Sequence, residues 1–466
     1  MQPVAIVAFM LHISLTVTAI PTCQVDGSTA KCESDDSQII LPKGLGGSVQ
    51  LRKLHINYVG PPTEITPSLL IEYPLLVELK IRGNFNKLEE SLLEKQSLLC
   101  KLYITNTLIS EIPEFLFSSN TSFRSPLTHL VLNHNKLTDF PLALFKYIPK
   151  LEKLDVASNC IYRLECDLGS EFTQLQSLRS LNISGAKLNS KACRLPKQGS
   201  KNVTPTRSST ENSLEIFNPI NENLEHLSLA ITTWRLALDK QFAEHLGRFK
   251  SLKTLDLSGA LFRACPHEYL RPIFEHLPSS LTKLKLQRLR TFGEMSRGNR
   301  TCSLSAGDLA PLRSLHSLET LDFKYSDLIF GHSIDSGLFV DLTSLRELNL
   351  GYCRISIVKD GAFEGLSNLT KVILDGNPLG SRQFSLQSTN NRTIKDLSMK
   401  RCGMASDNSS VYHPVSGMIR NLTRIDLSGN FLRYNPLFVL QRGHHKNVLQ
   451  DDQCVSQNES EIHANL

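Results

Sequence analysis

The sequence predicts an α/β solenoid, in which similar layers of chain stack on one another and curve into a horseshoe. Three features of the 466 residues support this fold: a leucine pattern recurs along most of the chain, its starts are mostly 23 to 29 residues apart, and asparagine often stands at the ninth position of the unit. One such unit cannot bury its own apolar face, so its neighbours must cover it. We expect a parallel β-sheet on the concave side, and loops and short helices on the convex side.

The clearest unit begins at Leu345, where Leu345, Leu348 and Leu350 form the pattern L-x-x-L-x-L. Cys353 stands where asparagine or cysteine is typical, and Phe363 closes the unit. This pattern is that of a leucine-rich repeat. The first six residues of each unit are expected to form a strand with alternating inward and outward side chains. The predicted repeats start at Leu51, Leu76, Leu99, Leu127, Leu151, Leu178, Leu224, Leu252, Leu281, Leu318, Leu345, Leu369, Ile394 and Leu422.

The ninth position of the unit predicts how the chain turns after each strand. An inward asparagine there can bond backbone groups of its own layer and of the adjacent layer. The ladder asparagines are Asn84, Asn135, Asn159, Asn377 and Asn430. In the centre, at about residues 178–317, the position holds Ala186, Thr232, Ala260 and Leu289, and two repeat intervals widen to 46 and 37 residues. Since Ala and Leu cannot form the ladder, we expect altered curvature in this central segment.

Other side chains have predicted places in the repeats. Phe117, Phe145 and Phe363 share one offset and are expected to form an aromatic spine under the convex side. Of the wide intervals, 191–213 and 290–304 read as exposed loops because they are polar and poor in apolar residues, and a degenerate repeat is expected near 214–220. Cys100 and Cys160 are expected to be core thiols.

The ends of the chain predict three further segments. Residues 1–19 are interpreted as a cleaved signal peptide, because the stretch is mostly apolar and has a suitable cleavage spacing at Val17 and Ala19. An uncleaved anchor is the alternative, although polar residues interrupt the stretch. Residues 20–50 are expected to cap the first layer, and the repeats to occupy 51–445. The tail, 446–466, lacks the cysteines of a complete C-terminal cap, so we expect dimerisation there or a longer receptor.

The eleven cysteines suit an oxidising compartment. Cys23 and Cys32 are predicted to form a disulfide in the N-terminal cap. Cys166 and Cys193 share an offset in adjacent repeats and are predicted to pair, and Cys265–Cys302 is a further candidate. Nine N-x-S/T sequons support a secreted, glycosylated protein, and they lie at Asn120, Asn182, Asn202, Asn299, Asn368, Asn391, Asn408, Asn421 and Asn458.

No enzymatic motif accompanies these features. The chain has no phosphate loop, zinc-binding spacing or nucleophile elbow, and the Gly-rich run at 44–47 lacks the Lys-Ser/Thr that follows in a phosphate loop. His444-His445 with Asp451-Asp452 is a weak metal candidate. We expect no catalytic residue, no cofactor and no metal. No stretch after the signal reaches about 18 consecutive apolar residues, so no membrane span is expected in this chain.

The chain resembles the extracellular domain of a Toll-like receptor over about residues 23–440. The resemblance rests on the cysteine cap, the ladder-poor centre, and the repeat motifs LNISG at 181–185, LDLSG at 255–259, VILDGN at 372–377 and IDLSGN at 425–430. It implies innate-immune pattern recognition, and the ladder-poor centre is similar to the subgroup that recognises lipids and lipopeptides. It also makes a homodimer, or a heterodimer with related receptors, compatible with this chain. Without a membrane helix or a cytoplasmic domain, the resemblance does not extend to signalling.

The outward strand residues of the concave face are the candidate contacts. Their basic excess, with a formal charge of +6 for the chain, favours an acidic protein, a lipid phosphate or a nucleic acid. A solvated polar face is the alternative for any one residue, and a matrix or adhesion protein or a soluble decoy is the alternative for the whole chain. A glycan at Asn182, on a concave strand, would direct binding away from the repeat at Leu178. The candidate ligand contacts are Lys53, His55, Lys80, Arg82, Lys101, Lys283, Lys285, Arg288, Lys324 and Asn349.

Overall fold

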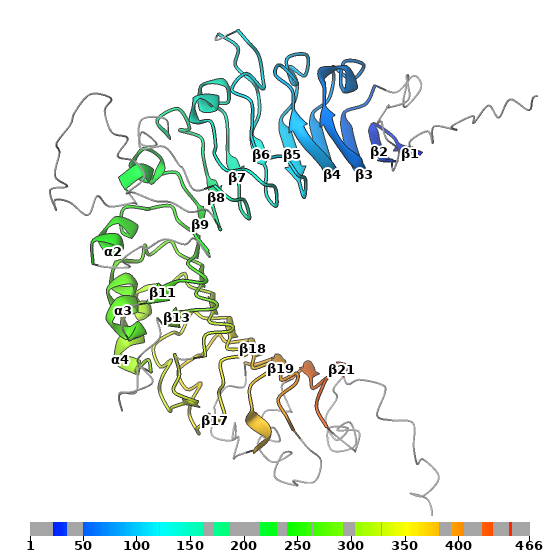
Figure 1. Cartoon of the computed structure of the whole chain (residues 1–466). Coiled ribbons are helices and arrows are strands. Elements are labelled where there is room, and N and C mark those ends of the chain that lie inside the picture. The colour runs from blue at the N-terminus through cyan, green and yellow to red at the C-terminus, as the bar shows by residue number, and fades with distance from the viewer. Residues whose placement is uncertain are drawn as a thin grey trace, which may run out of the picture.

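The computed structural model describes residues 22–34, 50–120, 122–161, 172–185, 215–230, 240–262, 265–291, 303–327, 329–381, 393–404, 422–431 and 447–449. Its strands line the inner side of an arc, and its α-helices lie on the outer side near the middle (Figure 1). The predicted horseshoe solenoid is confirmed, because successive layers pair through one long sheet. The predicted signal peptide, residues 1–19, lies outside the described residues.

Seventeen strands form this sheet. Strand pairing follows the order of the chain, and each pair is parallel except β1 with β2. Each predicted repeat start is followed two residues later by a strand, so the register is confirmed. The strands are β1 (Thr22–Asp26), β2 (Thr29–Ser34), β3 (Lys53–Ile65), β4 (Glu78–Leu88), β5 (Lys101–Thr105), β6 (His129–Val131), β7 (Lys153–Asp155), β8 (Ser180–Asn182), β9 (His226–Ser228), β10 (Thr254–Asp256), β12 (Lys283–Lys285), β14 (Thr320–Asp322), β16 (Glu347–Asn349), β18 (Lys371–Ile373), β19 (Asp396–Ser398), β20 (Arg424–Asp426) and β21 (Asn447–Leu449).

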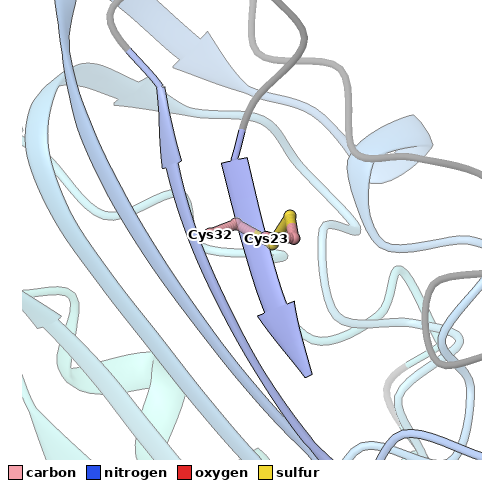
Figure 2. Close-up of a disulfide and its surroundings, with 2 residues drawn as sticks. All are labelled: Cys23 and Cys32. Atoms are coloured by element: carbon pink, nitrogen blue, oxygen red, sulfur yellow. A yellow bond between two sulfur atoms is a disulfide. The ribbon is translucent and has the colours of Figure 1, made fainter.

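The N-terminal cap is a hairpin of β1 and β2. The predicted Cys23–Cys32 disulfide joins the two strands directly across the hairpin (Figure 2). Ala30 and Cys32 are almost fully buried, because β2 pairs with β3 and lays its inward side chains on the first repeat. The hairpin therefore covers the apolar end of the stack, as a solenoid requires. At the other end, β21 continues the sheet into the segment that was expected to be a tail.

The core of each layer comes from the leucines of its repeat. Leu345, Leu348 and Leu350, for example, have no exposed surface. In the 17-stranded sheet, the strands from β6 onward have three residues instead of the expected six. They are short because the chain turns at the eighth repeat position. The first two repeats differ: β3 and β4 have 13 and 11 residues, because inward residues keep alternating past that position.

The returns on the convex side vary along the chain. Among the described residues, α-helices occur at α2 (Lys240–Leu246), α3 (Pro266–His276) and α4 (Ala306–Leu309), inside or just beside the ladder-poor centre. None of the helices in the described ranges is long and apolar enough to cross a membrane. Other returns form 3₁₀ turns, η1 (Pro67–Leu69), η2 (Leu142–Tyr147), η3 (Glu215–Ile220), η5 (Ala310–Ser314) and η6 (Leu379–Ser381), or two small parallel pairs, β11 (Leu261–Phe262) with β13 (Arg290–Thr291) and β15 (Ser333–Ile334) with β17 (Ile357–Val358).

The two wide intervals each contain one layer. Strand β8 pairs directly with β9, and β12 pairs directly with β14. The degenerate repeat expected near 214–220 is therefore wrong, since 215–220 forms the turn η3 of the same layer. The loop expected at 290–304 also begins with a short strand, β13, which pairs on the convex side. The loop predicted at 191–213 lies outside the described residues.

An aromatic spine runs under the convex side, as predicted. Phe117, Phe145 and Phe363 are almost fully buried. Phe145 stacks on Phe172 with ring centroids 5.6 Å apart, and Phe172 contacts Phe217 at 5.8 Å. These rings fill the return side of successive layers, so the spine holds the layers together where the sheet cannot.

The asparagine ladder is confirmed at four of its five predicted positions. Asn135, Asn159, Asn377 and Asn430 each donate from Nδ2 to carbonyl oxygens of their own and the preceding layer, at 2.7–2.8 Å. The fifth, Asn84, is half-buried and bonds two carbonyl groups near the surface, because Phe85 takes the inward place on the longer strand β4.

The centre replaces this ladder in part with other residues. Leu289 is buried at the ninth position and Ala260 packs against the core, as their apolar character predicts. Ser326 was not foreseen: it has no exposed surface, donates to the Leu286 carbonyl at 2.9 Å and accepts from the Leu289 N–H at 3.1 Å. The Ser326 hydroxyl therefore makes hydrogen bonds to backbone groups that an asparagine amide makes in other layers. Ala186 and Thr232 lie outside the described residues.

Among the described residues, four cysteines are unpaired, and they range from buried to exposed. Cys353 and Cys402 are buried at ladder positions, and desolvation raises the pKa of each thiol to about 12. Cys160, which was expected in the core, is exposed, and Cys100 is only half-buried. The prediction for Cys160 was wrong because the residue after the inward Asn159 already points away from the layer.

Candidate ligand-binding surface

The ten predicted contacts lie on the concave side or its edge, and none of them is buried. The register divides them into two groups that do not meet. Five lie on β3, β4 and β5, and five lie on or just after β12, β14 and β16. Strands β6 to β10 separate the groups. The N-terminal group is Lys53, His55, Lys80, Arg82 and Lys101, and the central group is Lys283, Lys285, Arg288, Lys324 and Asn349.

The N-terminal group surrounds one carboxylate. Where all three strands pair, over residues 53–57, 78–82 and 101–105, Glu78 is the one acid, and it lies in register between Lys53 and Lys101. Its Oε1 accepts from Lys80 Nζ at 2.7 Å and contacts His55 Nε2 at 3.1 Å. A single carboxylate therefore faces several cations, and the group keeps a positive excess.

Burial and neighbouring charges shift the pKa values of two histidines and one glutamate on these strands. Burial and the nearby Lys80 lower the pKa of His55, although the hydrogen bond to Glu78 opposes the change. Burial by itself would raise the pKa of Glu78, but the hydrogen bonds from Lys80 and His55 hold it below its usual value. On β6, burial and the charges of Lys101 and Lys153 lower the pKa of His129. Burial is the largest cause at both histidines, and the neighbouring lysines further disfavour a proton on each ring.

Two members of the central group are engaged within the protein. Lys285 Nζ lies 3.5 Å from a carboxylate oxygen of Asp256. Asn349 Oδ1 accepts from the Gly351 N–H at 3.1 Å, which satisfies the turn after β16. Acidic or amide side chains at the same repeat position bond the N–H two residues later in several other layers, namely Asp155, Asn182, Asp256, Asp322 and Asp426. Asn349 therefore has a structural role that leaves only its amide nitrogen for a ligand.

Arg288 and Lys324 belong to a cluster at the edge of the sheet, in the turns that follow β12 and β14. The Arg288 guanidinium lies 5.2 Å from the ring centre of Tyr325, and Tyr325 stacks on Tyr352 at 4.7 Å. Lys324 Nζ lies 5.1 Å from the Tyr325 ring and 5.6 Å from the Tyr352 ring. We call Arg288, Lys324, Tyr325 and Tyr352 the edge cluster. It joins three consecutive layers through cation–π and ring contacts.

The backbone of the edge cluster is strained. The eighth repeat position has positive φ in layer after layer, and most layers place Gly, Asn, Ser or His there. Arg288, Tyr325 and Tyr352 occupy it at φ of 52°, 64° and 57°. This conformation costs a residue with a side chain about 1–2 kcal/mol. Such strain persists where the surroundings enforce it, and it is concentrated at functional sites.

The sequence analysis selected Arg288 and Lys324 but missed both tyrosines. A signal was present, since the glycine of the motifs LNISG, LDLSG and VILDGN occupies the eighth position of its repeat. A bulky aromatic residue at the corresponding place in two consecutive repeats was therefore unusual. Outward-facing strand positions alone could not reveal it, because the cluster lies in the turns beyond the strands.

Of the predicted modification sites, three sequons fall within the described residues. Asn120 and Asn368 are exposed, and Asn182 is half-buried on the concave strand β8. The sequons at Asn202, Asn299, Asn391, Asn408, Asn421 and Asn458 lie outside the described residues, as do Cys166 and Cys193. Cys265 is disulfide-bonded, and its predicted partner Cys302 also lies outside the described residues. In the described part of the chain, His, Cys, Asp and Glu form no group of three or more that could hold a metal ion.

Comparisons with known proteins agree with this architecture. The family model of the leucine-rich repeat matches residues 125–188 and 331–379. No curated protein matches the sequence. Among solved structures, a TLR13–ssRNA13 complex matches at 17% identity and a TM-score of 0.52, over 90% of this chain and 64% of that chain. The chain thus spans 64% of the length of that relative, and the likeness shows the fold.

Two further structures are more distant. An internalin, InlF, from Listeria monocytogenes matches at 16% identity and a TM-score of 0.42, over 90% of this chain and 86% of that chain. An LRIM1/APL1C complex matches at 14% identity and a TM-score of 0.39, over 88% of this chain and 60% of that chain. With TM-scores below 0.5, neither supports an argument about this chain.

Proposed function

Because the chain is a leucine-rich-repeat protein, we propose that it is an extracellular binding protein of the Toll-like receptor ectodomain type, which recognises a microbial or damage-associated ligand. The fold provides a binding scaffold, and the proposed contact surface is the concave face with its edge. The proposal places the protein outside the cell, on the strength of the apolar leader, the nine sequons and the cysteine content. It assigns no catalytic role to the chain.

One observation carries the proposal: where β3, β4 and β5 pair, the concave face holds several cations and one carboxylate. In the N-terminal group, Glu78 alone faces Lys53, Lys80 and Lys101. A positive surface on a rigid sheet attracts anionic ligands and orients their approach. The solved TLR13 structure is a complex with a single-stranded RNA, so an RNA is one anionic ligand to test on this chain, beside lipopeptides and acidic proteins.

The test begins with the full chain expressed in a eukaryotic secretory host. We expect the protein in the medium, with the leader removed and glycans at Asn120 and Asn368. Retention in the cell without glycans would contradict the extracellular assignment. Binding to collagen, with none to microbial ligands, would favour the alternative of a matrix or adhesion protein.

Binding is then measured with single-stranded RNA, lipopeptide vesicles and an acidic protein, at several salt concentrations. The triple variant Lys53→Gln, Lys80→Gln, Lys101→Gln should weaken binding of an anionic ligand, because charge contacts fall with each lost cation. The control is Arg248→Gln, an exposed cation on the return side. Equal binding by the triple variant and the control would remove the N-terminal group from the site.

A further inference from the structure

The edge cluster carries two cationic side chains, Arg288 and Lys324. Among the described residues, Arg288 and Lys324 form no ion pair with a carboxylate. The acids near them are occupied: Asp322 accepts from Gln287 Nε2 at 2.6 Å and from the Lys324 N–H at 3.0 Å, and Asp327 pairs with Arg354 at 3.3 Å. By contrast, Lys371 pairs with Glu347 at 3.0 Å and Lys400 with Asp426 at 3.0 Å in the layers beyond.

The cluster is also held in one arrangement before any partner arrives. Tyr352 lies so close to Gly376 that a methyl group added there would be 2.3 Å from the ring. Gly376 therefore makes room for the Tyr352 ring. At Gly351 an added methyl group would lie 3.7 Å from the Lys324 stem, which is an ordinary van der Waals contact. The stack runs without interruption from Arg288 through Tyr325 and Tyr352 to the bare backbone at Gly376.

This geometry fits a carboxylate-bearing partner better than a nucleobase. Tyr325 is 39% exposed, but its ring is already in contact with the Arg288 guanidinium and stacks on the Tyr352 ring. A base would need a free ring face on which to stack. Ring edges are electropositive, and an exposed guanidinium offers a fork of N–H groups that suits a carboxylate. Tyrosine and arginine in a fixed arrangement are typical of the residues that dominate protein interfaces.

We infer that the edge cluster of Arg288, Lys324, Tyr325 and Tyr352 is the docking site for an acidic segment of a protein partner. The inference rests on the proposed binding function and narrows it to one surface and one partner chemistry. Its position, three or more layers past β8, keeps it away from a glycan at Asn182. The partner's carboxylates neutralise Arg288 and Lys324, and its chain covers the tyrosine edges.

The test compares two probes on the full secreted chain: a fluorescent oligo-glutamate peptide and a single-stranded oligouridine of equal charge. The double variant Tyr325→Gly, Tyr352→Gly removes the rings and places glycine where φ is positive, so the fold is retained. We expect its thermal midpoint to stay within about 2 °C of the parent, while oligo-glutamate affinity falls at least tenfold. The control His134→Gly makes the same backbone change at φ of 57°, far from the cluster, and should leave affinity unchanged.

A second variant separates charge from geometry. Arg288→Lys keeps the charge but loses the guanidinium fork, so we expect a weakening of several-fold if carboxylates are held by the fork. Oligo-glutamate binding that survives the double variant overturns the inference. So does tighter binding of oligouridine that the double variant abolishes, because a nucleic acid would then be the partner. Secretion, glycosylation and the effect of the N-terminal triple variant are measured separately, so failure at the edge cluster is distinguishable from failure of the proposed function.

Discussion

Replacing Asn377 by alanine tests whether the buried ladder stabilises the stack. Asn377 has no exposed surface and makes four hydrogen bonds. Its Nδ2 donates to the carbonyls of Leu350 and Leu374 at 2.8 Å, and its Oδ1 accepts from the N–H groups of Cys353 and Ile355 at 3.0 Å. A buried backbone group left without a partner costs about 1–3 kcal/mol. The two N–H groups lose their acceptor entirely, so Asn377→Ala should lower the free energy of unfolding by about 3–5 kcal/mol.

Asn84→Ala is the matched control, because it changes the same residue type at the same repeat position. Asn84 is half-buried, and its Nδ2 bonds only the carbonyls of Val59 and Gly60, at 3.2 and 2.8 Å. Water can replace those bonds, so the expected loss is about 1 kcal/mol or less. Urea unfolding followed by circular dichroism on the full chain measures both variants. Equal losses, or a loss at Asn377 no larger than about 1 kcal/mol, would refute the reasoning.

The remaining predictions concern thiols and protons. Cys160 is exposed, so it should react with a thiol reagent in the folded protein, whereas Cys353 and Cys402 should react only after unfolding, because burial raises the pKa of each to about 12. Rapid labelling of all three would contradict the burial. Burial and nearby lysines hold the pKa of His129 below its usual value of 6.5, so the unfolded chain takes up more protons near that pH and stability should fall as pH drops from about 7 to 5. His129→Asn should reduce this dependence, measured by urea unfolding, more than the exposed control His134→Asn; an unchanged pH profile would remove His129 as a cause.

The repeat register was predictable because one physical requirement recurs in every layer. Each strand must present leucines to the same core. The leucine pattern, such as that around Leu348, therefore locates the strand in every repeat. The ladder followed for the same reason, since a buried turn needs an amide such as that of Asn377. Ser326 was missed because we looked for asparagine at this position, whereas here a serine hydroxyl bonds the backbone groups of Leu286 and Leu289.

The candidate surface was only partly predictable. Alternation along a strand shows which side chains face outward, and it placed Lys53 and Lys283 correctly on the concave side. It does not show which cations are neutralised across layers, as Lys285 is by Asp256. It also says nothing about turns, where Tyr325 meets the Arg288 guanidinium and the Tyr352 ring. Those two contacts join residues 27 or more positions apart in sequence, which only the stacking of layers brings together.

A glycan placed on the concave face tests the central claim, that this face and its edge bind the ligand. Gly351→Thr creates an N-x-T sequon at Asn349, beside Lys324 and the edge cluster. Gly351→Ala is the control, because it adds the first side-chain atom in the same space without a sequon. Oligo-glutamate affinity is measured for both proteins, and for the glycosylated one before and after endoglycosidase trimming. The account predicts lost binding with the glycan, recovery after trimming, and near-normal binding by Gly351→Ala. Unchanged binding by a fully glycosylated Gly351→Thr protein would contradict it.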